Sequence, residues 1–283
     1  MIVARLRPPG PVGFFRADER SVGTHPAPTE MKSIGEPTPE GHEEIGRMSV
    51  ASGDTTVVTE PEAASRELEG EDPSEVLRWA LNAFESGDLV LSTSFGGVGG
   101  IALIHMLHQE GARVPVFFVD TLYHFPETLE LAERVRERYD LDLQVLRPAR
   151  DRKAFEAEHG PRLWERDLDR FHRLTKVEPM EEALAGVRGW ITGRRRDQSE
   201  TRRGLPVVEE RPERVKINPL AAWSGKDVWA FVQVHGLPYN PLHDHGYPSV
   251  GDRPLTTPAG PGEEERAGRW RGLERLECGL HDL

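Results

Sequence analysis

Strand-like apolar segments alternate with helical patterns from Asp72 to Leu146, and this alternation restricts the fold more than any other feature of the chain. A helix is expected after Asp72, because a proline follows it and apolar residues then recur at helical spacing up to Phe84. Strands are expected at 88–93, 114–119 and 143–146, separated by helices at 101–110 and 126–139. Strands that alternate with helices at such lengths form βαβ units, so we predict an α/β protein with a parallel sheet.

The second half of the chain continues this pattern and then becomes irregular. A further strand is expected at 189–192 and a short edge strand at 215–217, and Ser224 is expected to cap a helix that runs to about Val234. Residues 1–72 are rich in Pro, Gly, Glu, Ser and Thr without a sustained period, so we expect a disordered or loosely attached extension. Translation starting at Met31 or Met48 is an alternative explanation of that stretch. We therefore divide the chain into an extension at 1–72, an α/β domain at 73–237 and a loop-rich C-terminal segment at 238–283.

The composition excludes several classes of protein. With 36 Lys and Arg against 48 Asp and Glu, the formal charge is −12, which argues against general nucleic-acid binding. No apolar run approaches the roughly 20 residues of a membrane span. The first residues carry no signal-peptide pattern and the chain has one cysteine, so we expect a reducing, cytoplasmic environment.

Two loops at the carboxyl ends of expected strands are suited to bind an anion or a nucleotide. In the loop 94–100, glycines allow a ligand to approach the backbone, and the next helix offers its N-terminus. This loop matches neither the P-loop nor the GxGxxG fingerprint, so a tight turn without a ligand explains it equally well by itself. The loop 120–128 begins with Asp120, which either caps a helix or orients a ribose hydroxyl. Open α/β sheets bind ligands at this edge, which favours a site there.

Cationic side chains gather in a short segment of this acidic chain. The cluster consists of Arg194, Arg195, Arg196, Arg202 and Arg203. Guanidinium groups bind phosphate or sulfate in a planar, bidentate manner, although a solvated loop is the alternative for some of them. Lys176 is either another cation of a site or ordinary surface charge.

The single cysteine, Cys278, lies five residues from the C-terminus. One thiol cannot form a disulfide, a Cys-ligated zinc site or an iron–sulfur cluster within one chain. It is therefore either an incidental thiol near a terminus or a nucleophile on a mobile arm. His281 and the tail arginines Arg266, Arg269 and Arg271 would lower the pKa of the thiol, and Glu277 would oppose that effect.

With these motifs in this order, the chain resembles the sulfonucleotide reductases, thioredoxin-dependent enzymes that reduce adenylylated sulfate to sulfite. The resemblance runs from about residue 80 to the end of the chain. It rests on STSFG at 92–96, DTLYHFPET at 120–128, KVEPM at 176–180, GRRRDQS at 193–199 with Arg202, and ECGLH at 277–281. It implies a three-layer, parallel-sheet fold of the adenine-nucleotide α-hydrolase type, related to the PP-loop proteins, with a mobile C-terminal tail.

Members of this family differ in whether they hold a [4Fe–4S] cluster. Cluster-containing members, which mostly use adenosine 5′-phosphosulfate (APS), carry two cysteine pairs that fall here on Phe171 and His172, and on Asp252 and Leu255. The resemblance thus implies the cluster-free branch, without a bound metal or other cofactor, which mostly uses 3′-phosphoadenosine 5′-phosphosulfate (PAPS). The segments near Tyr247 and at 265–270 look more like the other branch, so an APS reductase without a cluster is the alternative.

The resemblance also implies a reaction and a set of site residues. Cys278 attacks the sulfur of the substrate and becomes a Cys–S–SO₃⁻ adduct, with His281 as a thiolate stabiliser or a packing residue. The expected substrate site consists of Ser92, Ser94, Phe95, Gly96, Asp120, Thr121, Lys176, Arg195, Arg196, Arg202, Arg266 and Arg269. Arg195 or Arg196 is expected to bind the 3′-phosphate.

Because no second cysteine exists, sulfite release requires an external dithiol, and thioredoxin or glutaredoxin is the expected partner of a homodimeric enzyme. Two other functions remain open. An ATP pyrophosphatase-type adenylyltransferase shares the fold but typically carries SGGxDS in its first loop, where this chain has Val98 and no aspartate. A non-enzymatic nucleotide sensor would bind the nucleotide and form no adduct.

Overall fold

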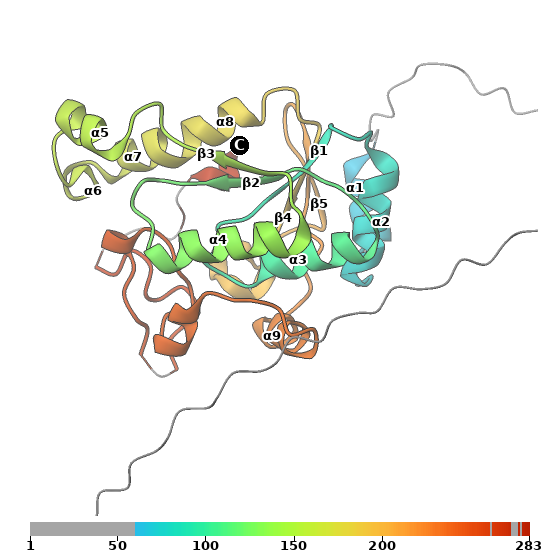
Figure 1. The fold of residues 1–283 in the computed structure, drawn as a ribbon. Helices are drawn as coiled ribbons and strands as arrows, with labels where there is room; N and C mark the ends of the chain where they lie inside the picture. Colours follow the sequence, from blue (N-terminus) through green and yellow to red (C-terminus); the bar gives the residue numbers. More distant parts are fainter. Residues whose placement is uncertain (1–59, 261, 273–276, 278) are drawn as a thin grey trace, which may run out of the picture. The chain divides into compact units, whose positions relative to one another are not determined.

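The computed structural model describes residues 60–260, 262–272, 277 and 279–283. Their centre is a six-stranded sheet with the order β3-β2-β1-β4-β6-β5 (Figure 1). The strands are β1 (Leu89–Ser92), β2 (Val116–Val119), β3 (Leu143–Leu146), β4 (Gly189–Thr192), β5 (Val208–Glu210) and β6 (Val215–Ile217). β5 runs antiparallel to β6, and the other neighbouring pairs are parallel. The predicted α/β class with a mainly parallel sheet is confirmed.

One face of the sheet is covered by helices from both halves of the chain. They are α1 (Pro61–Glu67), α2 (Pro73–Ala83), α3 (Gly99–Gln109), α4 (Pro126–Tyr139) and α9 (Gly225–Val234). Their apolar residues form the largest buried cluster together with Leu91, Phe118 and Ile191 of the strands. Side chains at helix starts fix these boundaries: Asp72 accepts a hydrogen bond from the Ser74 amide at 2.8 Å, and Ser224 forms a capping box with Asp227.

The opposite face carries α5 (Arg152–His159), α6 (Leu163–Arg166), α7 (Leu168–His172) and α8 (Glu178–Ala183) (Figure 1). A π-helical turn, Arg173–Val177, joins α7 to α8. Val90, Phe117 and Trp190 of the sheet pack against Met180 of α8. Leu280 and Leu283 pack against the same cluster. The sheet is therefore the middle of three layers, and the C-terminus lies in the outer layer that contains α8.

The topology places a switch point between β1 and β4. The chain runs outward from β1 to β2 and β3, and then returns to β4 on the other side of β1. Loops that follow the two strands at such a point lead away from each other and leave a crevice at the carboxyl edge. Here they are the loops that begin at Thr93 and Gly193, which the sequence singles out.

Two elements differ from the sequence prediction. The strand at 215–217 is not an edge strand, because β6 pairs with β4 on one side and with β5 on the other. A lysine within a strand is typical of an edge, but Lys216 is fully buried here. Helix α1 lies within the predicted extension and contacts β5, so ordered structure precedes residue 73. The division of the chain at residue 72 otherwise stays a prediction. Among the described residues, no helix has the length and apolarity to cross a membrane.

Candidate active site

A pocket opens at the carboxyl ends of β1 and β4, at the switch point of the sheet. The loop after β1, the segment 193–202, the end of β2 with the following loop up to His124, and the C-terminal segment all contribute to its wall. Ten of the residues that the sequence predicts for the site line this pocket. They are Ser92, Ser94, Gly96, Thr121, Lys176, Arg195, Arg202, Arg266, Arg269 and His281.

The loop after β1 is held close to the C-terminal part of the chain. Gly96 is required there, because a Cβ at this position would fall on the carbonyl oxygen of Val250. The Val250 amide donates to the Gly96 carbonyl oxygen at 2.8 Å, and Ser94 Oγ accepts a hydrogen bond from the Gly96 amide at 3.4 Å. This close approach joins two distant segments into one wall of the pocket.

Two buried arginines of the pocket are paired with carboxylates from the C-terminal segment. Arg195, 2% exposed, forms an ion pair with Glu265 and donates to Asp197 at 2.9 Å. Arg202, 5% exposed, donates from Nε and Nη2 to the carboxylate of Glu277 at 2.7 and 2.8 Å. The protein's own carboxylates thus occupy cationic positions that are suited to phosphate or sulfate.

Glu277 is held as an anion by this environment. Burial favours its neutral form, but hydrogen bonds from Arg202 and the charge of Arg266, whose Nη2 lies 3.3 Å away, keep the pKa of Glu277 below its usual value. Cys278 follows directly in the sequence. Because the charge of Glu277 is compensated, it opposes formation of a neighbouring thiolate less than the sequence implies.

A buried ion pair stands behind another part of the wall. Lys176 lies in the π-helical turn, a distortion frequent at functional sites, and its Nζ donates to Asp252 Oδ2 at 2.5 Å. Thr121 Oγ1 donates to the other carboxylate oxygen at 2.6 Å. Burial opposes ionisation of Asp252, but the Lys176 ammonium holds the pKa of that carboxyl well below its usual range. Asp252 therefore fixes both Thr121 and Lys176 at the pocket surface.

The four positions at which the resemblance places the cluster ligands of the other branch do not fit a [4Fe–4S] cluster here. Phe171 and Leu255 pack in an apolar cluster with Trp270, and neither has a ligating atom. Asp252 is engaged by Lys176, and His172 Nε2 lies 4.0 Å from the same carboxylate. Burial and the nearby ammonium lower the pKa of His172 to about 3, so this imidazole is neutral.

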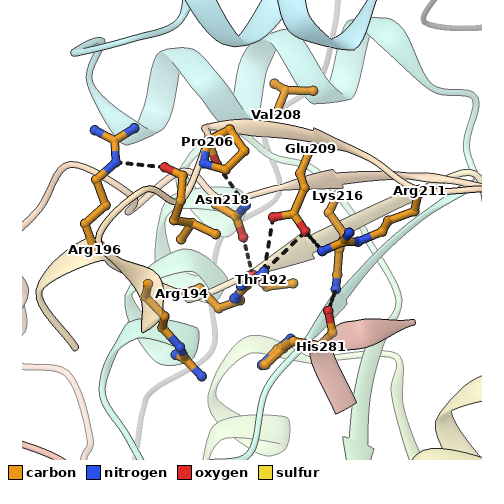
Figure 2. A network of polar contacts seen from close by, with 12 residues as sticks. Thr192, Arg194, Arg196, Pro206, Val208, Glu209, Arg211, Lys216, Asn218 and His281 are labelled. Atoms are coloured by element: carbon orange, nitrogen blue, oxygen red, sulfur yellow. Dashed lines mark hydrogen bonds and ion pairs between the residues drawn. The ribbon is translucent and has the colours of Figure 1, made fainter. Parts of the chain in front are cut away.

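The end of the chain docks beside β4 and β6. The ring of His281 stacks on Trp190 with a centroid distance of 5.9 Å and an interplanar angle of 26°. Its carbonyl oxygen accepts a hydrogen bond from Lys216 Nζ at 2.6 Å (Figure 2). Burial and the charges of Arg202 and Lys216 hold the pKa of His281 well below its usual value. A neutral ring cannot act as a cation beside a thiolate, which favours the packing role.

Three predicted site residues lie away from the pocket lining. Phe95 is fully buried and packs edge-on against Phe118, at a positive φ of 51°. Asp120 accepts hydrogen bonds from the Leu122 amide and from Arg147, so it stabilises the turn. Arg196 Nε donates to the Leu205 carbonyl oxygen at 2.7 Å, and its guanidinium forms a bidentate pair with Glu69 of the segment after α1. Cys278 lies outside the described residues.

The structure also adds residues that the sequence does not assign to the site. Arg194 lines the pocket and donates to Glu209 at 3.2 Å. Asp252 and Lys216 do not line the pocket but bind residues that do: Asp252 accepts from Lys176, and Lys216 donates to the carbonyl oxygen of His281. For Lys216 the local signal pointed the other way, because a lysine within a short strand is typical of an exposed edge.

Fold and pocket together define an α/β protein with a cationic pocket at the topological switch point. A profile of the phosphoadenosine phosphosulfate reductase domain matches residues 88–258. An adenosine 5′-phosphosulfate reductase of Bacillus cereus is 41% identical over 220 residues, covering 77% of this chain and 93% of the relative. A phosphoadenosine 5′-phosphosulfate reductase of Xanthomonas oryzae is 42% identical over 240 residues, covering 83% and 98%.

Comparison with solved structures supports the same family and the same fold. The crystal structure of a PAPS reductase from Candida auris, in complex with phosphate, has a TM-score of 0.64 at 33% identity and covers 75% of this chain and 100% of its own. An FMN adenylyltransferase of Candida glabrata shares the fold alone, with a TM-score of 0.52, 16% identity and 81% coverage of both chains. The chain belongs to the sulfonucleotide reductase family.

Proposed function

We propose that this protein reduces PAPS to sulfite and adenosine 3′,5′-bisphosphate in sulfate assimilation, through a sulfonate adduct on Cys278. The observation that carries the proposal is the group of cations Lys176, Arg195, Arg202 and Arg266, which line one pocket and are paired with carboxylates of the chain itself. A phosphosulfate nucleotide would replace Glu265 and Glu277 as the anionic partner of the arginines, while Asp252 stays paired with Lys176. The relatives named as PAPS reductases support this substrate class.

The first half-reaction is a displacement at sulfur. The thiolate of Cys278 attacks the sulfuryl sulfur, a sulfur–sulfur bond forms, and the bond from that sulfur to the bridging phosphate oxygen breaks. The electron pair of the broken bond leaves with the nucleotide phosphate. Arg202 and Arg266 are suited to stabilise the negative charge that develops there, because a low-dielectric site strengthens such interactions.

The second half-reaction requires a dithiol of the thioredoxin or glutaredoxin class. One of its thiolates attacks Cys278 Sγ, sulfite leaves with the bonding electron pair, and a mixed disulfide forms. The second thiol of the partner resolves it and returns Cys278 as a thiol. The dithiol loses two electrons and becomes a disulfide, while the sulfur of the substrate is reduced by the same two electrons.

APS is the second candidate substrate, because relatives of comparable identity carry that name. The 3′-phosphate distinguishes the two nucleotides. Arg195 is our candidate for its binding, since Arg196 is directed away from the pocket and paired with Glu69. We expect Arg195→Lys to lower kcat/KM for PAPS more than for APS, and Arg203→Lys, at an exposed position of the same segment, to change neither.

The proposal is tested by intact mass. Reduced protein is incubated with PAPS or APS in the absence of any dithiol, and we expect one sulfonate group per chain, formed faster with PAPS. Cys278→Ser should show no adduct. An adduct that persists in this variant would contradict the mechanism. If the enzyme turns over APS faster than PAPS with thioredoxin as reductant, APS and not PAPS is the substrate.

A further inference from the structure

Lys216 is a fully buried lysine that the reaction proposed above does not use. It lies in the middle of β6, and its Nζ is 4.3 Å from the centre of the Trp190 ring. Its ammonium donates at 2.6 Å to the backbone carbonyl oxygen of His281. A buried ammonium is costly unless it is hydrogen-bonded, so this site is built to receive a carbonyl of the C-terminal tail.

Further contacts hold the same end of the chain. The ring of His281 stacks on Trp190, and the indole Nε1 of Trp190 donates to Ser92 Oγ at 2.7 Å. Leu280 and Leu283 pack against the apolar cluster of that sheet face. The indole therefore connects the docked tail to the carboxyl end of β1, where the pocket begins.

The tail has a second anchor, which differs in chemistry. Glu277 is held by Arg202 and Arg266 through ion pairs within the cationic pocket. A phosphosulfate would compete with this carboxylate for the same guanidinium groups. The anchor at His281 consists of a carbonyl bound by Lys216 and a ring stack on Trp190. Lys216 is fully buried and does not line the pocket, so an anion bound there does not contact its ammonium. Cys278 lies between the two anchors in the sequence, one residue from Glu277 and three from His281.

We propose that Lys216 and Trp190 are positioning residues that anchor the tail at His281 and keep Cys278 at the pocket when the substrate displaces Glu277 from Arg202. The inference rests on the proposed function, since it assigns the tail a reactive thiol. Consecutive Cα atoms are about 3.8 Å apart, so an anchor three residues away restricts the thiol to a small volume. Loss of this anchor allows the thiol to leave the line of attack.

The first variant is Lys216→Met, which keeps the length of the side chain and removes the donor. Adduct formation is measured in a single turnover with PAPS and without dithiol, and binding of adenosine 3′,5′-bisphosphate is measured by calorimetry. We expect adduct formation to slow about 10- to 100-fold, because a displacement of about 1 Å has effects of that size. Nucleotide affinity should stay unchanged, since Lys216 does not line the pocket. Lys226→Met, at an exposed position of α9, is the matched control and should behave as wild type.

A second variant keeps the test decisive if Lys216→Met does not fold. Truncation after Gly279 removes the acceptor of Lys216 together with the ring stack and the Leu280 and Leu283 contacts, and it keeps Cys278, so it should slow adduct formation at least as much. If both variants fold, their combination should be no slower than the slower single variant, because the truncation already removes the contact that Lys216→Met breaks. The proposed anchor would be overturned if either single variant formed the adduct at the wild-type rate. It would also be overturned if the two rate reductions multiplied in the combined variant.

Failure of the anchor and failure of the proposed function are distinguishable. If wild-type protein forms no adduct with PAPS or APS, the proposed function is wrong. Alkylation of Cys278 by iodoacetamide then tests the anchor alone, and the signal is specific because the chain has one cysteine. We expect Lys216→Met to be alkylated faster than wild type in the presence of adenosine 3′,5′-bisphosphate. Equal rates would overturn the inference.

Discussion

Lys176 Nζ lies 2.5 Å from Asp252 Oδ2, and these two residues form a buried ion pair between the π-helical turn and the C-terminal segment. Lys176 lines the pocket, whereas Asp252 is fully buried behind it and also accepts from Thr121. The resemblance to the sulfonucleotide reductases places a cysteine of the cluster-containing branch at the position of Asp252. A carboxylate at this position gives the lysine a fixed counter-charge within the fold, and the pair joins two segments that build the site.

The first prediction concerns Asp252→Asn. This change keeps the shape of the side chain and leaves the buried ammonium of Lys176 without an anion, which typically costs about 3 to 5 kcal/mol of stability. The free energy of unfolding from urea titrations at pH 7 should fall by about this amount.

Asp142→Asn is the matched control, because Asp142 is exposed on the segment before β3. It should leave the free energy of unfolding within about 0.5 kcal/mol of wild type. The interpretation of Asp252 is wrong if both variants unfold at the same urea concentration. Since the pKa of Asp252 is depressed, its contribution is present above the usual aspartate pKa and is lost only in strong acid.

The second prediction concerns the bidentate arginine of the pocket. Arg202→Lys replaces a planar fork, which holds both carboxylate oxygens of Glu277, by a single ammonium. One lost charge-assisted hydrogen bond corresponds to about 1.5 to 3 kcal/mol, so KM for the sulfonucleotide should rise about 10- to 100-fold.

Arg203→Lys provides the comparison, since its neighbouring guanidinium is exposed and pairs with Glu200. Steady-state kinetics of the two variants with thioredoxin as reductant checks the prediction. Equal KM values in both would show that Arg202 does not contact the substrate.

Local patterns predicted much of the fold but only part of the site. The bounds of α4, β3 and β4 follow from apolar periodicity, proline and glycine, which act over a few residues. The Lys176–Asp252 and Lys216–His281 contacts join positions 76 and 65 residues apart, and no local pattern encodes them. Motif membership alone also misplaces a residue: Arg196 lies within the arginine-rich motif, yet its guanidinium pairs with Glu69 and does not line the pocket.

The third prediction concerns the role of His281. Its imidazole is neutral, because burial and neighbouring cations lower its pKa. His281→Phe keeps an aromatic ring for the stack on Trp190 and should leave the pKa of the Cys278 thiol unchanged. The rate of iodoacetamide alkylation between pH 6 and 10 gives this pKa. His281→Ala removes the ring and should slow adduct formation about tenfold. A thiol pKa raised by about one unit in His281→Phe would instead indicate an imidazolium beside the thiolate.

The fourth prediction uses the titration of Lys216. Burial lowers the pKa of this ammonium to about 7, with the charges of Arg194 and Arg211 acting in the same direction and those of Glu209 and Asp282 opposing it. In the unfolded chain the lysine titrates near its usual pKa of about 10.4. Between these two values the unfolded state binds more protons, so the contribution of Lys216 to stability increases as pH rises from 7.

We therefore expect the difference in unfolding free energy between wild type and Lys216→Met to shift in favour of wild type from pH 7 to pH 9. The shift is at most about 1.4 kcal/mol per pH unit. Taking the difference between the two proteins removes groups that titrate alike in both, and a reductant keeps Cys278 as a thiol. Urea titrations at pH 6, 7, 8 and 9 give the profile. If the difference in unfolding free energy between wild type and Lys216→Met stays constant from pH 6 to 9, Lys216 keeps an ordinary pKa in the folded protein. Its ammonium would then make the contact with His281 without losing its hydration.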